Sequence, residues 1–250
     1  METLYIVVPC YNEEEVLPQS SSVFEEKITQ LQKSGLISDD SKVMLVDDGS
    51  KDSTWDIISG LCEKSNTFCG VKLSRNRGHQ NALCAGLVTA MEKADITVSI
   101  DADLQDDVNA IDKMVEARKS GVEIVCGVRS SRESDTFLKR TTARGYYALM
   151  NFFGAKLIFD HADFRLLSRE ALKRLFCYGT EDLFLRGLVP RLGLKIETTS
   201  YDRSARLAGE SKYSVAKMLA LASKGIGLNR IRPAGEMQIG ELYIEKVTNV

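Results

Sequence analysis

The stretch Lys42–Lys64 reads KVMLVDDGSKDSTWDIISGLCEK and contains a candidate strand, a turn and a helix in direct succession. Lys42–Asp47 is a short apolar run of strand length, and Asp48–Gly49 is a dipeptide typical of turns. From Ser53 to Lys64 apolar residues recur at spacings of three and four, which predicts an amphipathic helix. Units of this kind build a parallel sheet covered by helices.

The same alternation continues through the first half of the chain. Five runs have the length and β-branched content of strands: Leu4–Pro9, Lys42–Asp47, Val71–Ser74, Ile96–Ile100 and Glu123–Gly127. Four segments between them have helical spacing: Glu14–Lys33, Ser53–Lys64, His79–Lys93 and Val108–Ser120. The second half is less regular, with helices expected at Tyr146–Phe153 and from Arg169. We therefore predict an α/β fold with a mostly parallel sheet flanked by helices.

Composition excludes several classes of protein. The formal net charge of −2 gives no signal for nucleic-acid binding. The six cysteines are scattered, without a C-x-x-C pair, and are interpreted as reduced thiols. The chain begins without a secretory signal and contains no apolar window of about 18 residues, the length needed to span a bilayer. We therefore expect a cytoplasmic protein that can meet a membrane only from its surface.

Polar residues follow three of the expected strands. Pro9–Glu13 reads PCYNE, Asp47–Ser50 reads DDGS, and Asp101–Asp107 reads DADLQDD. Ligands of such sheets bind beyond the carboxyl ends of the strands, so these segments predict one acidic edge. Two unit charges about 4 Å apart repel by roughly 4 kcal/mol at an effective dielectric of about 20, so Asp101 and Asp103 favour a bound cation.

Hard oxygen ligands suit magnesium or manganese, which would neutralise a departing nucleoside diphosphate. Taken alone, the spacing D-x-D more often marks a solvated turn or a helix N-terminus. Its position directly after an apolar strand favours its interpretation as a metal site. No G-x-G-x-x-G, no G-x-x-x-x-G-K-[ST] and no G-x-S-x-G occurs. His79 and His161 are the two histidines, and we expect each at the surface or behind a functional residue.

Six motifs, in order, resemble glycosyltransferase family 2 and within it the polyprenyl-phosphate glycosyltransferases, which include bactoprenol glucosyltransferases and dolichyl-phosphate mannose synthases. They are VVPCYNEEE (Val7–Glu15), VDDGSKD (Val46–Asp52), LSRNRGHQNAL (Leu73–Leu83), DADLQDD (Asp101–Asp107), ADFRLLSR (Ala162–Arg169) and RLAGESK (Arg206–Lys212). The resemblance covers roughly residues 4–225. It implies the A-type glycosyltransferase fold and transfer with inversion at the anomeric carbon.

The resemblance also implies roles for individual residues. Those expected to bind the nucleotide part of a nucleotide-sugar donor are Pro9, Tyr11, Asn12, Glu13, Asp47 and Asp48. Asp101 would face the donor sugar or ribose, while Asp103 and Gln105 would ligate the metal. Arg129 would lie near phosphates, and Arg206, in the R-x-x-G-x-S-K pattern, would close over phosphate.

Asp163 in ADFR is the candidate for positioning the acceptor or acting as a base. A phosphate acceptor is already ionised at neutral pH and scarcely needs a base, whereas a hydroxyl acceptor requires one. Glu181–Asp182 is a rival candidate for that base, with a helix start as its other interpretation. A basic cluster would suit an anionic lipid phosphate: Arg129, Arg132, Lys139, Arg140 and Arg144. We therefore expect transfer of a hexose, with UDP-glucose favoured, to polyprenyl phosphate.

The last part of the chain is interpreted as a separate region, so that 1–212 forms the catalytic domain and 213–250 an appendage. Tyr213–Lys224 is apolar on one side, which fits a helix in a membrane interface and equally an ordinary packed helix. Relatives continue from this helix into membrane-spanning helices. The segment from Gly235 resembles the part of those relatives that lies after their last membrane helix, so we expect that the spanning part has been lost. The predicted protein is peripheral to the cytosolic face of a membrane and can form a homo-oligomer.

Two other functions stay open. One is a soluble family 2 glycosyltransferase that acts on a hydroxyl acceptor. The other is a non-catalytic remnant that binds a nucleotide; the intact acidic motifs argue against it, and the missing membrane helices argue for it.

Overall fold

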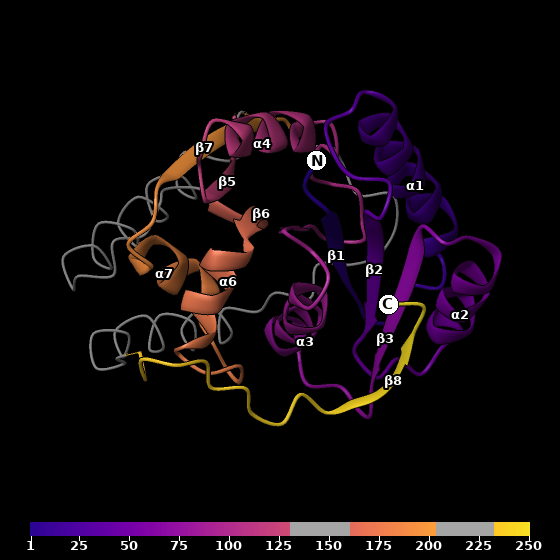
Figure 1. Cartoon of the computed structure of the whole chain (residues 1–250). Coiled ribbons are helices and arrows are strands. Elements are labelled where there is room, and N and C mark those ends of the chain that lie inside the picture. Colours follow the sequence, from indigo (N-terminus) through magenta and orange to yellow (C-terminus); the bar gives the residue numbers. More distant parts are fainter. Residues whose placement is uncertain (131–160, 204–232) are drawn as a thin grey trace, which may run out of the picture.

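The computed structural model describes residues 1–130, 161–203 and 233–250, and these residues build one eight-stranded sheet with helices on both faces (Figure 1). The strands are β1 (Leu4–Cys10), β2 (Lys42–Asp47), β3 (Phe68–Leu73), β4 (Ile96–Ser99), β5 (Ile124–Arg129), β6 (His161–Ser168), β7 (Ile196–Tyr201) and β8 (Ile244–Thr248). The helices are α1 (Leu17–Lys33), α2 (Thr54–Lys64), α3 (His79–Met91), α4 (Ala110–Lys119), α6 (Arg169–Phe176) and α7 (Leu185–Leu188), followed by a 3-10 turn at Val189–Arg191.

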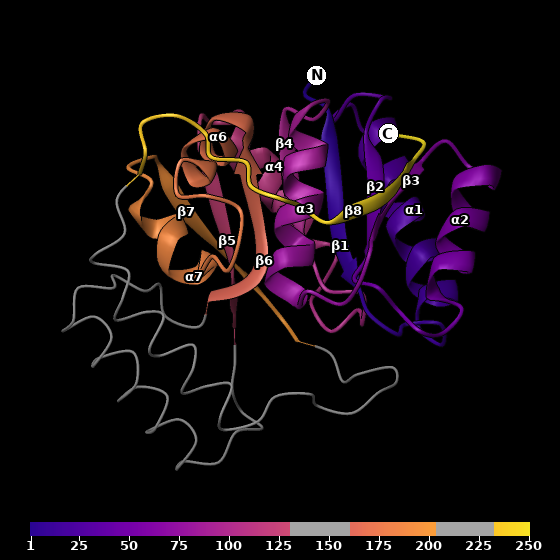
Figure 2. The same ribbon diagram turned by 90° about the horizontal axis from the view of Figure 1, so that it is seen from below.

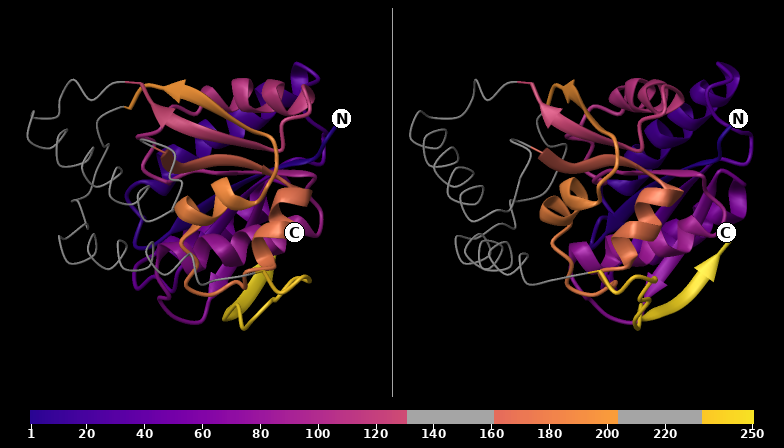
Figure 3. Two further views of the ribbon diagram at one scale, coloured as in Figure 1. Left: turned by 90° about the vertical axis from the view of Figure 1, so that its left-hand side faces the viewer. Right: turned by 60° about the vertical axis from the view of Figure 1, so that its left-hand side comes forward.

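The strand order is β7-β5-β6-β4-β1-β2-β3-β8. Strands β1 to β4 form a parallel block, as the alternation of strands and helices predicted. Strand β6 lies between β4 and β5 and is antiparallel to both, so β5 is not adjacent to the parallel block. Strand β7 runs parallel to β5 at one edge of the sheet, as both views in Figure 3 show.

Alternate residues of the strands belong to two separate hydrophobic cores, one on each face of the sheet. On β1, Tyr5 and Val7 point to the core that contains α3 and α6, whereas Ile6 and Val8 point to the core that contains α1, α2 and α4. This is the period of two that a strand buried on both faces requires. Figures 1 and 2 show the two groups of helices on opposite faces of the sheet. All six cysteines are free thiols, and all except Cys177 are buried, in agreement with the sequence analysis.

The segment from residue 233 to the C-terminus belongs to the same body as the rest of the described chain. It passes α6, where the Ala234 and Gln238 N–H groups donate to the carbonyls of Cys177 and Phe176 at 2.9 Å each, and then forms β8 (Figure 2). Strand β8 pairs antiparallel with β3. The sequence analysis did not predict this strand, because three of its five residues are exposed and it lacks a continuous apolar run.

Several predictions fall on residues outside the described ranges. They are the helices Tyr146–Phe153 and Tyr213–Lys224, the basic residues from Arg132 to Arg144, Arg206, and the boundary between 1–212 and 213–250. Within the described ranges, no helix combines the length and the apolar character that crossing a bilayer requires.

Candidate active site

The loops after β1 and β2 are joined by hydrogen bonds at the carboxyl edge of the sheet. The Asn12 N–H donates to Ser50 Oγ at 2.9 Å, and Asn12 Oδ1 accepts from the Lys51 N–H at 2.9 Å. The Glu13 N–H donates to Thr54 Oγ1 at 2.9 Å. Asn12 has a φ of 52°, a left-handed conformation that asparagine tolerates better than most residues. Pro9 and Tyr11 lie half-buried beside this junction.

Asp47 and Asp48 are both buried where β2 ends. Asp47 accepts from the Ser50 N–H through Oδ1 at 3.1 Å, while its Oδ2 is buried without a hydrogen-bond partner in the described part of the chain. Asp48 accepts from the N–H groups of Arg77 and Gly78 at 2.7 and 2.9 Å. Burial raises the pKa of both carboxyl groups. The side chain and N–H of Ser50 partly oppose the rise at Asp47, and the N–H groups of Arg77 and Gly78 partly oppose it at Asp48. Within the described residues, the edge therefore carries one buried carboxylate, Asp47, with an unsatisfied oxygen, and a second, Asp48, that holds the loop after β3.

Gly49 allows that loop to approach. Its φ is +64°, and a Cβ built on it would lie 2.4 Å from the backbone carbon of Arg75. A side chain at position 49 would therefore clash with backbone as well as strain the turn. The predicted turn at Asp48–Gly49 is confirmed, and the close contact with Arg75 explains why glycine occupies it.

The DADLQDD motif turns sharply after β4. Leu104 has a φ of 51°, and the Gln105 N–H donates to Asp103 Oδ1 at 3.2 Å. The Gln105 side chain accepts a hydrogen bond from Arg203. Asp106 is buried and accepts from Tyr201 Oη at 2.8 Å, which ties the motif to β7. Leu104, Gln105 and Asp106 thus fix the shape of the turn that carries Asp103.

His79, the first residue of α3, lies between two carboxylates. Its Nε2 is 3.7 Å from Asp101 Oδ1 and 3.7 Å from Asp163 Oδ2. The surrounding protein desolvates the Asp101 carboxyl, although its side chain is half-exposed, and raises its pKa; His79 opposes the rise, whereas Asp163 and Asp103 add to it. The acidic edge predicted from the sequence therefore extends from β4 to β6 through His79.

Asp163 on β6 is held by two arginines. Arg165, with 1% of its surface exposed, donates to Oδ1, and Arg186 on α7 donates to Oδ1 at 3.3 Å and to Oδ2 at 3.1 Å. Gln80 adds a contact to Oδ2 at 3.4 Å. Burial alone would raise the pKa of Asp163, but the charges of Arg186, Arg165 and His79 hold it well below its usual value. Asp163 is thus an ionised carboxylate over the whole physiological pH range.

The other predicted residues are more scattered. Arg129 ends β5 and is half-buried. Burial raises the pKa of the neighbouring Asp106, and the charge of Arg129 partly opposes that rise. Glu181 and Asp182 are exposed. The alternative interpretation of this pair as a helix start is wrong, because α7 begins at Leu185 with Phe184 as its N-cap.

Sequence reasoning missed Arg165 and Arg186, and it expected His79 only at the surface or behind a functional residue. His79 and Arg165 lie inside motifs that carried the family resemblance, so the motifs themselves were a signal. Arg186 lies on a helix of four residues with no motif, and only the packing of α7 beside β6 brings it to Asp163.

The acidic edge offers a metal ion few ligands but suitable ones. Among the described residues, no three His, Cys, Asp or Glu side chains gather as a metal site. Asp101, Asp103 and the amide of Gln105 supply hard oxygen atoms, and magnesium is typically held by one or two carboxylates together with substrate phosphates. The donor set therefore fits a cation that a diphosphate would help to bind.

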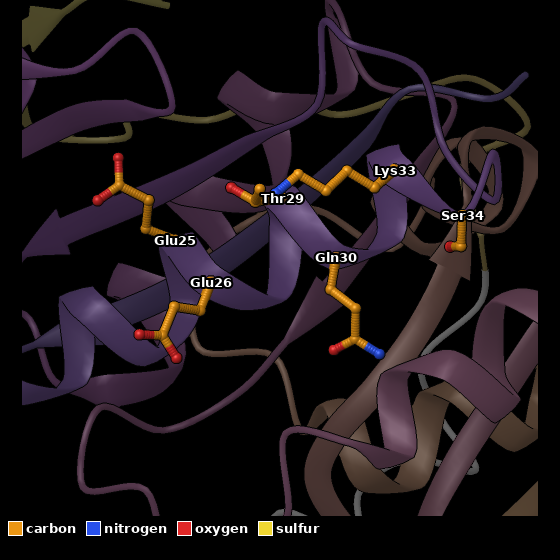
Figure 4. Close-up of a pocket in the computed structure, with 6 residues that line it drawn as sticks. All are labelled: Glu25, Glu26, Thr29, Gln30, Lys33 and Ser34. Atoms are coloured by element: carbon orange, nitrogen blue, oxygen red, sulfur yellow. The ribbon is translucent and has the colours of Figure 1, made fainter.

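A hollow on α1 lies apart from this edge. Figure 4 shows the side chains that line it, which are Glu25, Glu26, Thr29, Gln30, Lys33 and Ser34. They come from the second half of α1 and the residue after it. A helix that follows a strand runs back from the strand's carboxyl end, so the second half of α1 lies away from the edge that carries the acidic residues. Because one helix supplies the whole lining, the hollow gathers no groups for chemistry.

Comparison with known proteins decides the family. The family model described as "Glycosyl transferase family 2" matches residues 5–176. The chain belongs to glycosyltransferase family 2. The uncharacterized glycosyltransferase YkoT of Bacillus subtilis (strain 168) is 49% identical over 230 residues, which cover 92% of this chain and 68% of that protein. The bactoprenol glucosyl transferase of Shigella phage SfV is 35% identical over 222 residues, or 88% of this chain and 70% of that protein.

Solved structures agree on the fold of this family 2 member. The glucosyl-3-phosphoglycerate synthase of Mycobacterium tuberculosis in complex with phosphoglyceric acid superposes with a TM-score of 0.61 at 20% identity, covering 96% of this chain and 88% of that chain. The same enzyme in complex with Mn²⁺, UDP-glucose and phosphoglyceric acid gives 0.57 at 21% identity, covering 94% and 82%. The predicted A-type glycosyltransferase fold is confirmed, and the chain is a glycosyltransferase.

Proposed function

We propose that this glycosyltransferase moves a hexose, glucose in the first instance, from UDP-glucose to polyprenyl phosphate, with inversion and with help from a divalent metal. The similarity to the bactoprenol glucosyl transferase of phage SfV over 88% of the chain supports the acceptor and the sugar.

The observation that carries the choice of acceptor is the pair of arginines on Asp163. A general base works best with a pKa near the operating pH, and the pKa of Asp163 is held well below its usual value. Asp163 is therefore poorly suited to take a proton from a hydroxyl group. A lipid phosphate presents an oxygen that is already ionised, so its attack on the anomeric carbon needs no base.

Asp163 then acts as an anchor for cations. It fixes the guanidinium of Arg186, which is 38% exposed, at the acidic edge beside His79. Cations placed there would attract two phosphate-bearing substrates to an edge that otherwise carries several carboxylates. Arg129 and Arg206 are proposed to contribute in the same way.

The donor is proposed to lie across the ends of β1, β2 and β4. Asp47, whose buried Oδ2 has no hydrogen-bond partner among the described residues, and the junction of Tyr11, Asn12 and Glu13 would bind the nucleoside. Asp101 would contact the donor sugar or ribose. Asp103 and Gln105 would hold magnesium or manganese, which when bound neutralises the diphosphate as it leaves. In this scheme the bond from the sugar to the diphosphate breaks as the bond to the lipid phosphate forms.

A membrane acceptor implies a location at the cytosolic membrane surface. We propose that residues 213–250 include the contact with it, with Tyr213–Lys224 as a helix in the interface. Association into a homo-oligomer would increase the number of such contacts.

Incubation with UDP-glucose, manganese and a short polyprenyl phosphate tests the proposal. We expect a glycosylated lipid phosphate, no product with the corresponding polyprenol, and loss of product in Asp103→Ala. Parallel reactions with GDP-mannose and with a soluble saccharide acceptor test the alternatives. Transfer to the saccharide hydroxyl, with none to the lipid phosphate, would contradict the proposed acceptor. Binding of nucleotide without transfer to any acceptor would favour the non-catalytic alternative.

A further inference from the structure

The C-terminal strand reaches the same sheet edge that carries the donor residues. Strand β8 pairs with β3 as far as Leu73, the last residue of β3, which lies opposite Ile244, the first residue of β8. The contact continues one step further, because the Ser74 N–H donates to the carbonyl of Tyr243 at 2.9 Å. Figures 1 and 2 show β8 alongside β3. Tyr243 is therefore placed where the loop between β3 and α3 begins.

The ring of Tyr243 lies against the guanidinium group of Arg77. The Cζ atom of Arg77 is 3.6 Å from the ring centroid, and that of Arg75 is 5.7 Å away. The Nε atom of Arg77 is buried and has no hydrogen-bond partner in the described part of the chain. An aromatic face attracts such a cation and partly replaces the water that it has lost.

Arg77 is also the residue whose backbone holds Asp48. Its N–H and that of Gly78 donate to the two carboxylate oxygens of Asp48, and its carbonyl accepts from Asn81 Nδ2 at 2.8 Å. Gly78 has a φ of 88°, so the backbone turns sharply at this contact. The side chain of Arg77 therefore faces the C-terminal segment while its backbone faces Asp48.

We propose that Tyr243 is a positioning residue for the donor site, which fixes Arg77 and through it the backbone donors that orient Asp48. The inference deepens the proposed function and depends on it at one point, the role of Asp48 in binding the nucleotide. It gives the C-terminal segment a part in donor binding, although none of its residues is assigned to contact the donor.

A purely structural role for Tyr243 can be distinguished from the proposed positioning role. If the residue only held β8 to the sheet, its loss would act like the loss of any other side chain on that strand. Val247 provides the matched control, because it lies on β8 opposite Val71, is 45% exposed and pairs with β3 itself rather than with the loop that follows β3. Tyr243→Phe keeps the aromatic face and removes only the hydroxyl group.

Hydrogen–deuterium exchange on peptides covering residues 74–81 measures the positioning directly. We expect faster exchange in Tyr243→Ala, with wild-type exchange in Tyr243→Phe and Val247→Ala. Titration with UDP and Mn²⁺ should show binding weakened by roughly threefold to thirtyfold in Tyr243→Ala, the range that a cation–π contact corresponds to. In kinetics the donor KM should rise while kcat stays nearly constant, the pattern of lost ground-state binding.

Unchanged exchange over residues 74–81 in Tyr243→Ala would overturn the inference. Equal loss of UDP binding in Val247→Ala and Tyr243→Ala would overturn it as well. If Tyr243→Ala does not fold, Tyr243→Leu gives the same comparison, because leucine keeps an apolar contact and lacks the aromatic face. A wild-type chain that binds neither UDP nor GDP in the presence of Mn²⁺ would contradict the proposed function instead, and exchange would still decide the positioning.

Discussion

Arg186 on α7 binds both carboxylate oxygens of Asp163 on β6, with Nε 3.3 Å from Oδ1 and Nη2 3.1 Å from Oδ2. The fork of a guanidinium matches a carboxylate in this way, and such pairs are stronger than neutral hydrogen bonds. Arg165 donates to the same carboxylate from the buried side. The site therefore contains a fixed ion cluster in which Arg186 is the partly exposed member.

Replacing Arg186 by alanine should lower kcat/KM for lipid glycosylation by roughly tenfold to a hundredfold, the loss typical of a displaced positioning group. The matched control is Lys195→Ala, because Lys195 forms an exposed pair with Glu197 at 3.6 Å. Exposed pairs contribute little, so this variant should keep wild-type kinetics. Wild-type kcat/KM in Arg186→Ala would show that the clamp on Asp163 has no part in transfer.

Asp163→Asn should destabilise the protein in a pH-dependent way. The variant leaves Arg165 buried without its charge partner, which costs about 3–5 kcal/mol at neutral pH. The pKa of Asp163 in the folded state lies below its unfolded value of about 3.9. Its contribution is therefore complete above about pH 4 and is lost as the pH falls through the folded-state pKa. Urea unfolding from pH 7 to pH 2.5 should show the two proteins converging at acid pH.

Asp47→Asn is a control for which stability should depend on pH in the opposite direction. Burial raises the pKa of Asp47 in the folded state, so its carboxylate binds a proton more tightly when folded than when unfolded. Relative to the variant, the wild-type protein should gain stability as the pH falls through that raised pKa toward about 3.9. A difference that does not change with pH in either variant would contradict the assigned directions.

Gly49→Ala should destabilise the fold by about 2–4 kcal/mol, because it combines strain at a φ of +64° with a clash against the Arg75 backbone. Gly60→Ala is the matched control. Gly60 lies inside α2 with nothing within 4 Å of an added Cβ, so alanine there should stabilise by about 0.5–1 kcal/mol. Urea midpoints of the two variants on opposite sides of wild type would support both assignments, and equal midpoints would contradict them.

The parallel block of the fold was predictable from sequence because each strand is a buried apolar run. Lys42–Asp47 was predicted with the bounds that the structure gives, and β1 differs from its prediction by one residue. The edge strands β7 and β8 were missed. Three of the six residues in Ile196–Tyr201 and three of the five in Ile244–Thr248 are exposed, so these sequences lack the continuous apolar character that reveals a central strand.

Within the candidate site, the carboxylates were predictable and their cationic partners were not. Asp101 and Asp103 immediately follow an apolar strand, so local sequence places them at the carboxyl edge. Arg186 reaches Asp163 from 23 residues away through the packing of a four-residue helix, and local sequence gives no sign of such a contact. The buried position of Arg165 depends in the same way on β6 lying between β4 and β5, an arrangement that no sequence pattern indicated.

The central claim is that the acidic edge binds a divalent metal together with the diphosphate of the donor. Crystals soaked with MnCl₂ and UDP, measured at the manganese absorption edge, test it most directly. We predict an anomalous peak at the Asp103 carboxylate, continuous with diphosphate density, and no peak in Asp103→Ala crystals. Nucleotide and manganese both absent from that edge in well-diffracting wild-type crystals would contradict the claim.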